Sequence, residues 1–251
     1  MVRRHANEST AELCIELEPI ADAGDAGAAH LLVADGVAVR YGRRLAVTEA
    51  SLELDRGEVV ALIGHNGCGK STTLRALAGL VPLATGRVAT RGAMVALVPA
   101  VDAVFADLTV TENLSLGARG ETRPDQLARR RADVIDVFPE LARRLDDVAG
   151  TLSGGEQRMV GTGLALMCRP DVLLLDEPTQ TLSPVVARRV LDAVRRLADE
   201  RGAGVLIAEA HVAAAVRVAD RVYTMRAGAI IGEHRGDTVR AIGPTGWWRL
   251  L

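Results

Sequence analysis

The stretch EVVALIGHNGCGKST, residues 58–72, decides the fold of this chain. Its first part, Glu58–Ile63, is an apolar run of the kind found in strands that are covered on both faces. Gly64–Ser71 then matches the pattern G-x-x-x-x-G-K-[ST], and Ser71–Leu80 has helical periodicity that stops at Pro82. A strand, a glycine-rich loop and a helix in this order are the context that the pattern needs. The stretch therefore predicts a phosphate-binding loop in an α/β fold.

Each part of this loop has a physical reason to bind phosphate. Glycines let backbone N–H groups approach phosphate oxygens, and the following helix presents its positive end to the same anion. Lys70 is the only lysine among 30 basic residues, and its compact ammonium suits the β- and γ-phosphates. The alternative is a glycine-rich turn that binds nothing, and Cys68 is either a reactive thiol or a tolerated filler. We expect nucleotide binding by Gly64, His65, Asn66, Gly67, Cys68, Gly69, Lys70, Ser71 and Thr72.

A second apolar run, Val172–Leu175, ends in two acids, Asp176 and Glu177. In a parallel sheet these acids lie at the carboxyl edge, where ligands of α/β proteins bind. Asp176 is suited to hold Mg²⁺ together with the Ser71 hydroxyl. Glu177 is suited to polarise the water that attacks a γ-phosphate, as the catalytic residue. Without the phosphate loop upstream, a helix cap would be the simpler interpretation of these acids.

Composition excludes several classes of protein. The chain has 251 residues, of which 49% are hydrophobic, and this is enough for one large or two small domains. Its formal charge of -2 argues against nucleic-acid binding by bulk electrostatics. No apolar stretch approaches the roughly 20 residues that a membrane span needs. The sequence thus indicates a globular protein with no nucleic-acid partner.

The remaining pattern alternates strands with helices and predicts a mostly parallel sheet covered on both faces. Residues 1–29 are expected to be a flexible extension, with an ordered extra strand as the alternative. Residues 241–251 are expected to be a tail, in which Trp247-Trp248 either pack against the domain or mark a membrane or partner surface. Strands are expected at 31–39, 50–54, 172–175, 205–208, 221–225 and 229–232, and two more within 86–98 around Arg91-Gly92. Helices are expected at 127–138, 141–148, 158–167, 184–200 and 212–218.

A third motif resembles a family signature. Leu152-Ser153-Gly154-Gly155-Glu156-Gln157 precedes a helical run and by itself indicates a helix start with a serine cap. Its place between the phosphate loop and the acidic strand, with Tyr41 before both, resembles the signature of ATP-binding cassette (ABC) proteins. The resemblance covers about residues 31–235. It implies an α/β fold, a P-loop NTPase of the ABC ATPase type, with a mostly parallel sheet core and a β-rich lobe. An inserted helical lobe at about 101–165 would lie within an ATP-binding domain at 30–240.

The resemblance also implies ligands and partners. ATP and Mg²⁺ would lie in a head-to-tail dimer with a second ATP-binding subunit, in a homodimer or a heterodimer. Tyr41 would stack on the adenine, while Ser153, Gly154, Gly155 and Glu156 would bind the ATP held by the partner. The chain would be an ATPase coupled to transport, cytoplasmic and peripheral on the inner face of the cell membrane.

One branch of the family is more similar to this chain than the others are. Val98-Pro99, followed by the run Val104–Leu114, is similar to the ATP-binding subunits of branched-chain amino acid importers. That similarity implies membrane permease subunits as partners, contacted by residues 105–114, and indirectly a substrate-binding protein. The alternative function is a soluble ABC protein that uses ATP as a conformational switch in regulation or repair.

The sequence departs from the family's pattern at two positions. Ala100 stands where the family usually has Gln, or Glu in this branch, and Ala210 where it usually has His, or Gln in this branch. His211 comes one residue later and should point away from the direction of Ala210. The Asp that is usual before Pro184 is Ser183 here, a change that the importer branch tolerates. We expect ATP binding to be intact, hydrolysis at this chain's own site to be weak, and the signature to serve the partner's site.

Overall fold

The computed structural model describes residues 14–15, 30–101, 103–118, 120–243 and 246–247. Its strands form one ten-stranded sheet in the order β1-β6-β7-β8-β4-β9-β10-β3-β2-β5. The strands are β1 (Cys14–Ile15), β2 (His30–Tyr41), β3 (Arg44–Asp55), β4 (Val59–Ile63), β5 (Thr85–Ala89), β6 (Val95–Val98), β7 (Val172–Asp176), β8 (Gly204–Glu209), β9 (Arg221–Arg226) and β10 (Ala229–Arg235).

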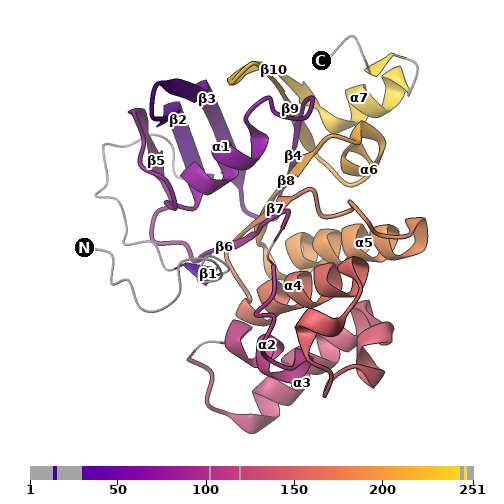
Figure 1. The fold of residues 1–251 in the computed structure, drawn as a ribbon. Coiled ribbons are helices and arrows are strands. Elements are labelled where there is room, and N and C mark those ends of the chain that lie inside the picture. The colour runs from indigo at the N-terminus through magenta and orange to yellow at the C-terminus, as the bar shows by residue number, and fades with distance from the viewer. Residues whose placement is uncertain (1–13, 16–29, 102, 119, 244–245, 248–251) are drawn as a thin grey trace.

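The centre of the sheet is parallel, as the alternating pattern predicts. Strands β6, β7, β8, β4 and β9 run in the same direction. All residues of β4, β7 and β8 are buried, because helices or other strands cover both of their faces. Antiparallel pairing of β2 with β3 and β5 adds a β-rich lobe at one end, which lies beside α1 in Figure 1.

Helices cover the two faces of the sheet with different clusters of apolar side chains. Leu74 and Leu77 of α1 (Lys70–Leu77) pack on the same face as Val60 and Leu62. On the other face lie α5 (Pro184–Arg201), α6 (Val212–Val216) and α7 (Gly236–Ile242). Alternate residues of β4 thus enter different cores, which is the pattern of a strand covered on both sides.

A helical lobe lies away from the β-rich lobe (Figure 1). It contains α2 (Val110–Gly117), α3 (Pro124–Val137), α4 (Gly154–Cys168) and the short 3₁₀ segments η1 (Pro139–Arg143) and η2 (Ala149–Thr151). Phe138 and Leu141 are fully buried in its core. Helices α2 and α4 pack closely, because a Cβ on Gly117 would lie 2.1 Å from the Leu164 carbonyl oxygen. A glycine there lets two backbones approach.

The structure corrects several predicted elements. The expected helix at 141–148 is not formed, because η1 ends at Arg143 and turns follow it. Helix α2 was not predicted, since its eight residues are too short for a clear period. Helix α7 was also missed and crosses residue 241, where the tail was expected to begin.

The chain ends show two further features. Strand β1 pairs antiparallel with the edge strand β6, while the other residues of 1–29 lie outside the described part. Trp247 packs beside Val239, whose carbonyl accepts a hydrogen bond from the indole Nε1 at 2.9 Å, and Trp248 lies outside the described residues. Among the helices of the described residues, none combines the length and the apolar character that a membrane crossing requires.

Candidate functional site

The predicted loop and acids meet at one edge of the sheet. Strands β7, β8 and β4 are parallel neighbours, so their carboxyl ends lie side by side. Gly64 follows β4, while Asp176 ends β7 and Glu209 ends β8. The Pro99-Ala100 segment follows β6 at the same edge. Open α/β sheets bind ligands at such an edge.

Two glycines of the phosphate loop are required by close contacts. A Cβ on Gly64 would lie 2.4 Å from the Met225 carbonyl oxygen. Gly69 has φ of 116°, and a Cβ there would lie 2.8 Å from the Ala46 carbonyl oxygen. The loop is therefore held against β3 and β9 in a conformation that other residues would strain. His65, Asn66 and Gly67 are exposed at its tip.

Lys70 is folded into this loop. It is 4% exposed, and its Nζ donates hydrogen bonds to the carbonyl oxygens of Gly64 at 2.8 Å and His65 at 3.2 Å. Ser71 and Thr72 follow it in the first turn of α1 and are half-buried. Gly69 caps α1 without a side-chain hydrogen bond, so the first N–H groups of the helix have no side-chain cap. The loop thus combines a cation with a helix start that has no side-chain cap, which suits an anion.

Asp176 carries an unpartnered oxygen. The residue is 4% exposed, and within the described residues its Oδ1 has no hydrogen-bond partner. Burial raises the pKa of this carboxyl above its ordinary value, and the Ser71 hydroxyl opposes the rise. A buried carboxylate oxygen without a donor fits a hard cation such as Mg²⁺. The Asp176 and Ser71 side chains are therefore the ones that would hold the metal.

Glu177 has an unusual backbone. Its φ of 48° lies in the left-handed region, which costs a residue other than glycine free energy. Its N–H donates to the Ala208 carbonyl oxygen of β8 at 2.8 Å, and the side chain is half-buried. Such strain gathers at functional sites, where the surrounding structure holds it.

Cys68 is a buried, free cysteine of the phosphate loop. Its Sγ would lie 2.6 Å from a Cβ on Gly64, so the thiol fills the space that this glycine leaves. This contact favours a packing role over a reactive thiol.

The signature residues form a reciprocal cap at the start of α4. Ser153 Oγ accepts from the Glu156 N–H at 3.3 Å, and a Glu156 carboxylate oxygen accepts from the Ser153 N–H at 3.0 Å. The Ser153 hydroxyl, which donates to the Glu156 carboxylate at 2.8 Å, and the Ser153 N–H lower the pKa of Glu156. Gly154 is exposed, and a Cβ there would meet nothing within 4 Å. Among the described residues, no hydrogen bond or ion pair joins residues 153–156 to residues 64–72.

The other positions that the sequence analysis predicted to matter differ in exposure and in local role. Tyr41 is at the end of β2 and 47% exposed, so its ring is available for stacking. Ala100 and Ala210 are half-buried, while His211 is exposed at the N-cap of α6. Ser183 caps α5, where its side chain accepts from the Val186 N–H.

Sequence reasoning missed a polar network behind the acids. Glu209 Oε1 accepts hydrogen bonds from the Thr179 N–H at 3.1 Å and hydroxyl at 2.6 Å. The Arg158 guanidinium donates to the carbonyl oxygens of Pro99 and Ala100. In the sequence, the only indication of this network was an arginine in the helical run that follows the signature. These contacts join segments far apart in sequence.

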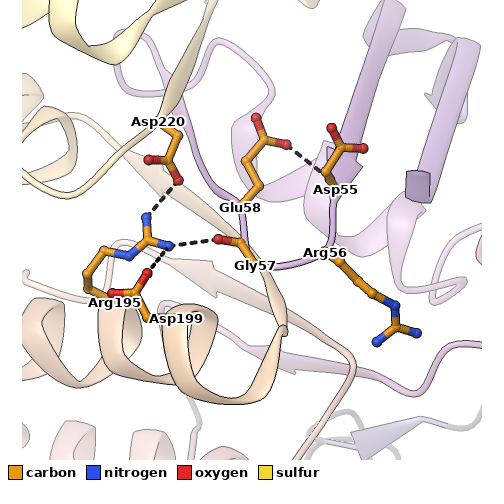
Figure 2. Close-up of a pocket in the computed structure, with 7 residues that line it drawn as sticks. All are labelled: Asp55, Arg56, Gly57, Glu58, Arg195, Asp199 and Asp220. Carbon is orange, nitrogen blue, oxygen red and sulfur yellow. Dashed lines mark hydrogen bonds and ion pairs between the residues drawn. The ribbon is translucent and has the colours of Figure 1, made fainter. Parts of the chain in front are cut away.

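A separate charged pocket of about 570 Å³ lies at the amino ends of the strands (Figure 2). Arg195 donates to Asp220 at 2.6 Å and to the Gly57 carbonyl oxygen at 2.7 Å, and it pairs with Asp199 at 2.8 Å. Because Glu58 precedes β4 and the phosphate loop follows it, this pocket is at the opposite edge from the acids. Its paired charges indicate a structural role.

Comparison with known proteins agrees with this arrangement. A family model described as ABC transporter matches residues 47–180. The chain is 36% identical over 219 residues to the high-affinity branched-chain amino acid transport ATP-binding protein BraG of Pseudomonas aeruginosa, covering 82% of this chain and 93% of that protein. It is also 36% identical over 220 residues to the phosphonates import ATP-binding protein PhnC of Frankia casuarinae, covering 78% and 87%.

The fold comparison gives the same result. A solved structure described as the ATP-binding subunit of an ABC transporter has a TM-score of 0.76 and 27% identity, covering 85% of this chain and 93% of that one. The α/β fold expected from the three motifs is therefore confirmed as that of an ABC ATPase. On this fold and these similarities, the chain belongs to the ABC transporter family, whose ATP-binding proteins are ATPases coupled to transport.

Proposed function

We propose that this chain binds and hydrolyses ATP in a head-to-tail dimer that powers a membrane importer. The observation that carries the proposal is the meeting of three features at one sheet edge. These are the loop around Lys70, the unpartnered oxygen of Asp176 and the strained backbone of Glu177. Paired with a phosphate loop, the two acids suit hydrolysis at a γ-phosphate.

Binding begins at the phosphate loop. The N–H groups at the start of α1 would donate to phosphate oxygens, and Lys70 would exchange its bonds to Gly64 and His65 for bonds to phosphate. Tyr41 would cover the adenine. Asp176 and Ser71 would hold Mg²⁺, which neutralises charge on the β- and γ-phosphates when bound.

Hydrolysis would use Glu177. Its carboxylate would accept a proton from a water whose oxygen forms a bond to the γ-phosphorus, while the bond from that phosphorus to the β–γ bridging oxygen breaks. ADP carries away the bridging oxygen, and inorganic phosphate is released. Ser153, Gly154, Gly155 and Glu156 would close the site on the partner subunit, because their helix start faces solvent.

Hydrolysis at the chain's own site is proposed to be slow. Ala100 and Ala210 offer no polar side-chain atom, and the loss of one group that contacts developing phosphate charge costs about 10²- to 10³-fold in rate. His211 is exposed, and on an extended chain its side chain would point away from the direction of Ala210. This chain would then be one half of an asymmetric heterodimer.

The transported solute is proposed from the branch similarity. The likeness of Val98-Pro99 and of the run Val104–Leu114 favours branched-chain amino acids or related small solutes. BraG supports this assignment, while the equal identity to PhnC makes phosphonates the competing class. The partners would be a second ATP-binding subunit, membrane permeases and, indirectly, a substrate-binding protein, on the cytoplasmic face of the cell membrane. The competing function is a soluble ATP-driven switch in regulation or repair.

The deciding experiment is steady-state MgATP hydrolysis by the purified chain at concentrations that favour dimers. Glu177→Gln tests the proposed base, and Glu140→Gln, which removes a carboxylate paired with Arg189, is a matched control. We expect the wild type and Glu140→Gln to turn over and Glu177→Gln to lose turnover while still binding ATP. Binding without turnover in all three would instead support the switch.

A further inference from the structure

Arg158 is a buried cation that the proposed hydrolysis does not use. It is 5% exposed and lies in α4, one helical turn after Gly154 of the signature. An arginine is costly to bury unless its donors are satisfied and its charge is compensated. The partners of its guanidinium therefore indicate what it does.

The guanidinium N–H groups of Arg158 donate to the backbone at the carboxyl edge of the sheet. Nη1 donates to the Pro99 carbonyl oxygen at 2.5 Å, and Nη2 donates to the Ala100 carbonyl oxygen. One guanidinium thus spans two successive peptides of the segment after β6. Ala100 has no side chain that could make such a link from its own side.

A close contact supports the same attachment one turn further along α4. A Cβ on Gly161 would lie 2.5 Å from the Ala103 Cβ and 2.7 Å from the Ala103 carbonyl oxygen. Helix α4 therefore lies directly against this part of the chain. Movement of α4 must be transmitted to the backbone near Ala100, because interiors are close-packed.

The charge of Arg158 is offset in part by the acids of the site. Burial lowers the pKa of its guanidinium, and attraction to the carboxylates of Asp176, Glu177 and Glu209 opposes that change. Glu209 in turn holds Thr179, which lies two residues after Glu177. The guanidinium of this signature-helix residue thus contacts the Pro99-Ala100 backbone and is attracted by the carboxylates at the strand ends.

We propose that Arg158 is a positioning residue that couples the signature to the hydrolytic site of the same chain. When the partner's ATP contacts Ser153–Gly155, it fixes the start of α4. Arg158 then fixes the Pro99-Ala100 segment beside Asp176 and Glu177. The two ATP sites of a dimer would be linked through this one side chain. The inference rests on the proposed function, since the coupling acts on ATP hydrolysis in a dimer.

The test compares Arg158→Gln and Arg158→Lys with a matched control, Arg130→Gln. Arg130 also donates to a backbone carbonyl of α4, that of Met167, but at the far end of the helix from the signature. Each variant is first checked for wild-type secondary structure and cooperative unfolding. ATP affinity, KM and kcat are then measured at concentrations that favour dimers.

We expect Arg158→Gln to lower kcat about ten- to a hundredfold while KM and the Kd for ATP stay within about threefold, because displacement of catalytic groups by about 1 Å costs that much. Arg158→Lys should recover part of the loss, since it keeps the charge but lacks the planar fork. Arg130→Gln should match the wild type. Wild-type kcat in Arg158→Gln would overturn the proposal.

A second measurement separates this inference from the proposed function. Amide hydrogen exchange is followed in peptides covering residues 95–101 and, as an internal reference, residues 70–77. We expect Arg158→Gln to accelerate exchange at 95–101 and leave 70–77 unchanged, even when the wild type does not hydrolyse ATP. If the wild type has no turnover and exchange still changes, the proposed function fails, and what stands is the attachment of residues 95–101 to α4 through Arg158. Unchanged exchange at 95–101 refutes the role of Arg158.

Discussion

Replacing Asp176 by Asn tests whether this buried carboxylate awaits a cation. The wild-type side chain is 4% exposed, and its Oδ1 has no hydrogen-bond partner within the described residues. An unsatisfied buried polar group costs about 1–3 kcal/mol. Asp176→Asn removes the charge and keeps the shape. We expect the nucleotide-free variant to be more stable at pH 8 by about 1–2 kcal/mol, because a neutral amide is less costly to bury than a carboxylate.

The stability gained by Asp176→Asn should depend on pH in a defined direction. Burial raises the pKa of Asp176 in the folded chain above its ordinary value of 3.8. A group whose pKa is higher in the folded than in the unfolded state stabilises the fold fully at pH values below its unfolded pKa. This stabilisation is lost as pH rises through the folded-state pKa. The wild type is therefore penalised at high pH, and the advantage of Asn should shrink as pH falls towards 4.

Thermal unfolding without nucleotide measures this effect. For a chain of this size, 1 kcal/mol shifts Tm by about 2–4 °C, so we expect Tm to rise by about 2–8 °C at pH 8. Asp171→Asn is the matched control, because its carboxylate precedes the same strand and already accepts from the Met94 N–H at 3.0 Å. That control should show no gain.

Added MgATP should reverse the order of stability. A ligand at 100 times its Kd stabilises the folded state by about 2.7 kcal/mol. The wild type should gain a Mg²⁺-dependent increase in Tm that Asp176→Asn lacks. Lower stability of Asp176→Asn at pH 8 without nucleotide, or a gain equal at pH 5 and pH 8, would refute the reasoning.

Three further changes have definite expected outcomes. Gly69→Ala should weaken ATP binding at least tenfold in a fluorescent-nucleotide titration, because its Cβ would lie 2.8 Å from the Ala46 carbonyl oxygen at φ 116°; unchanged affinity would show that the loop tolerates the shift. Glu209→Ala should cost about 1–3 kcal/mol in urea unfolding, since it removes the acceptor of both Thr179 donors, and a cost near zero would contradict this role. Phe138→Ala should destabilise the helical lobe by about 3–5 kcal/mol by the same measurement, because the ring is fully buried; a loss below 1 kcal/mol would indicate that the lobe collapses around the cavity.

Local patterns predicted the central sheet well. The apolar runs before Gly64 and Asp176 correspond to β4 and β7, because a strand buried on both faces leaves an uninterrupted apolar signature. The helical lobe was predicted less well. Residues 141–148 have an amphipathic pattern, yet Leu141 is buried within a 3₁₀ turn against Phe138, so tertiary packing overrode the local period.

The sequence by itself determined the phosphate loop, the acidic strand end and the signature. Their chemistry depends on residues adjacent in the chain, where glycine, lysine and serine must stand at set spacing. Only the tertiary structure decided which distant groups meet. Arg158 reaches Pro99 and Ala100 across nearly sixty residues, and Glu209 reaches Thr179 across thirty. Those contacts follow from strand order and helix packing, which place strand ends together and which no local spacing records.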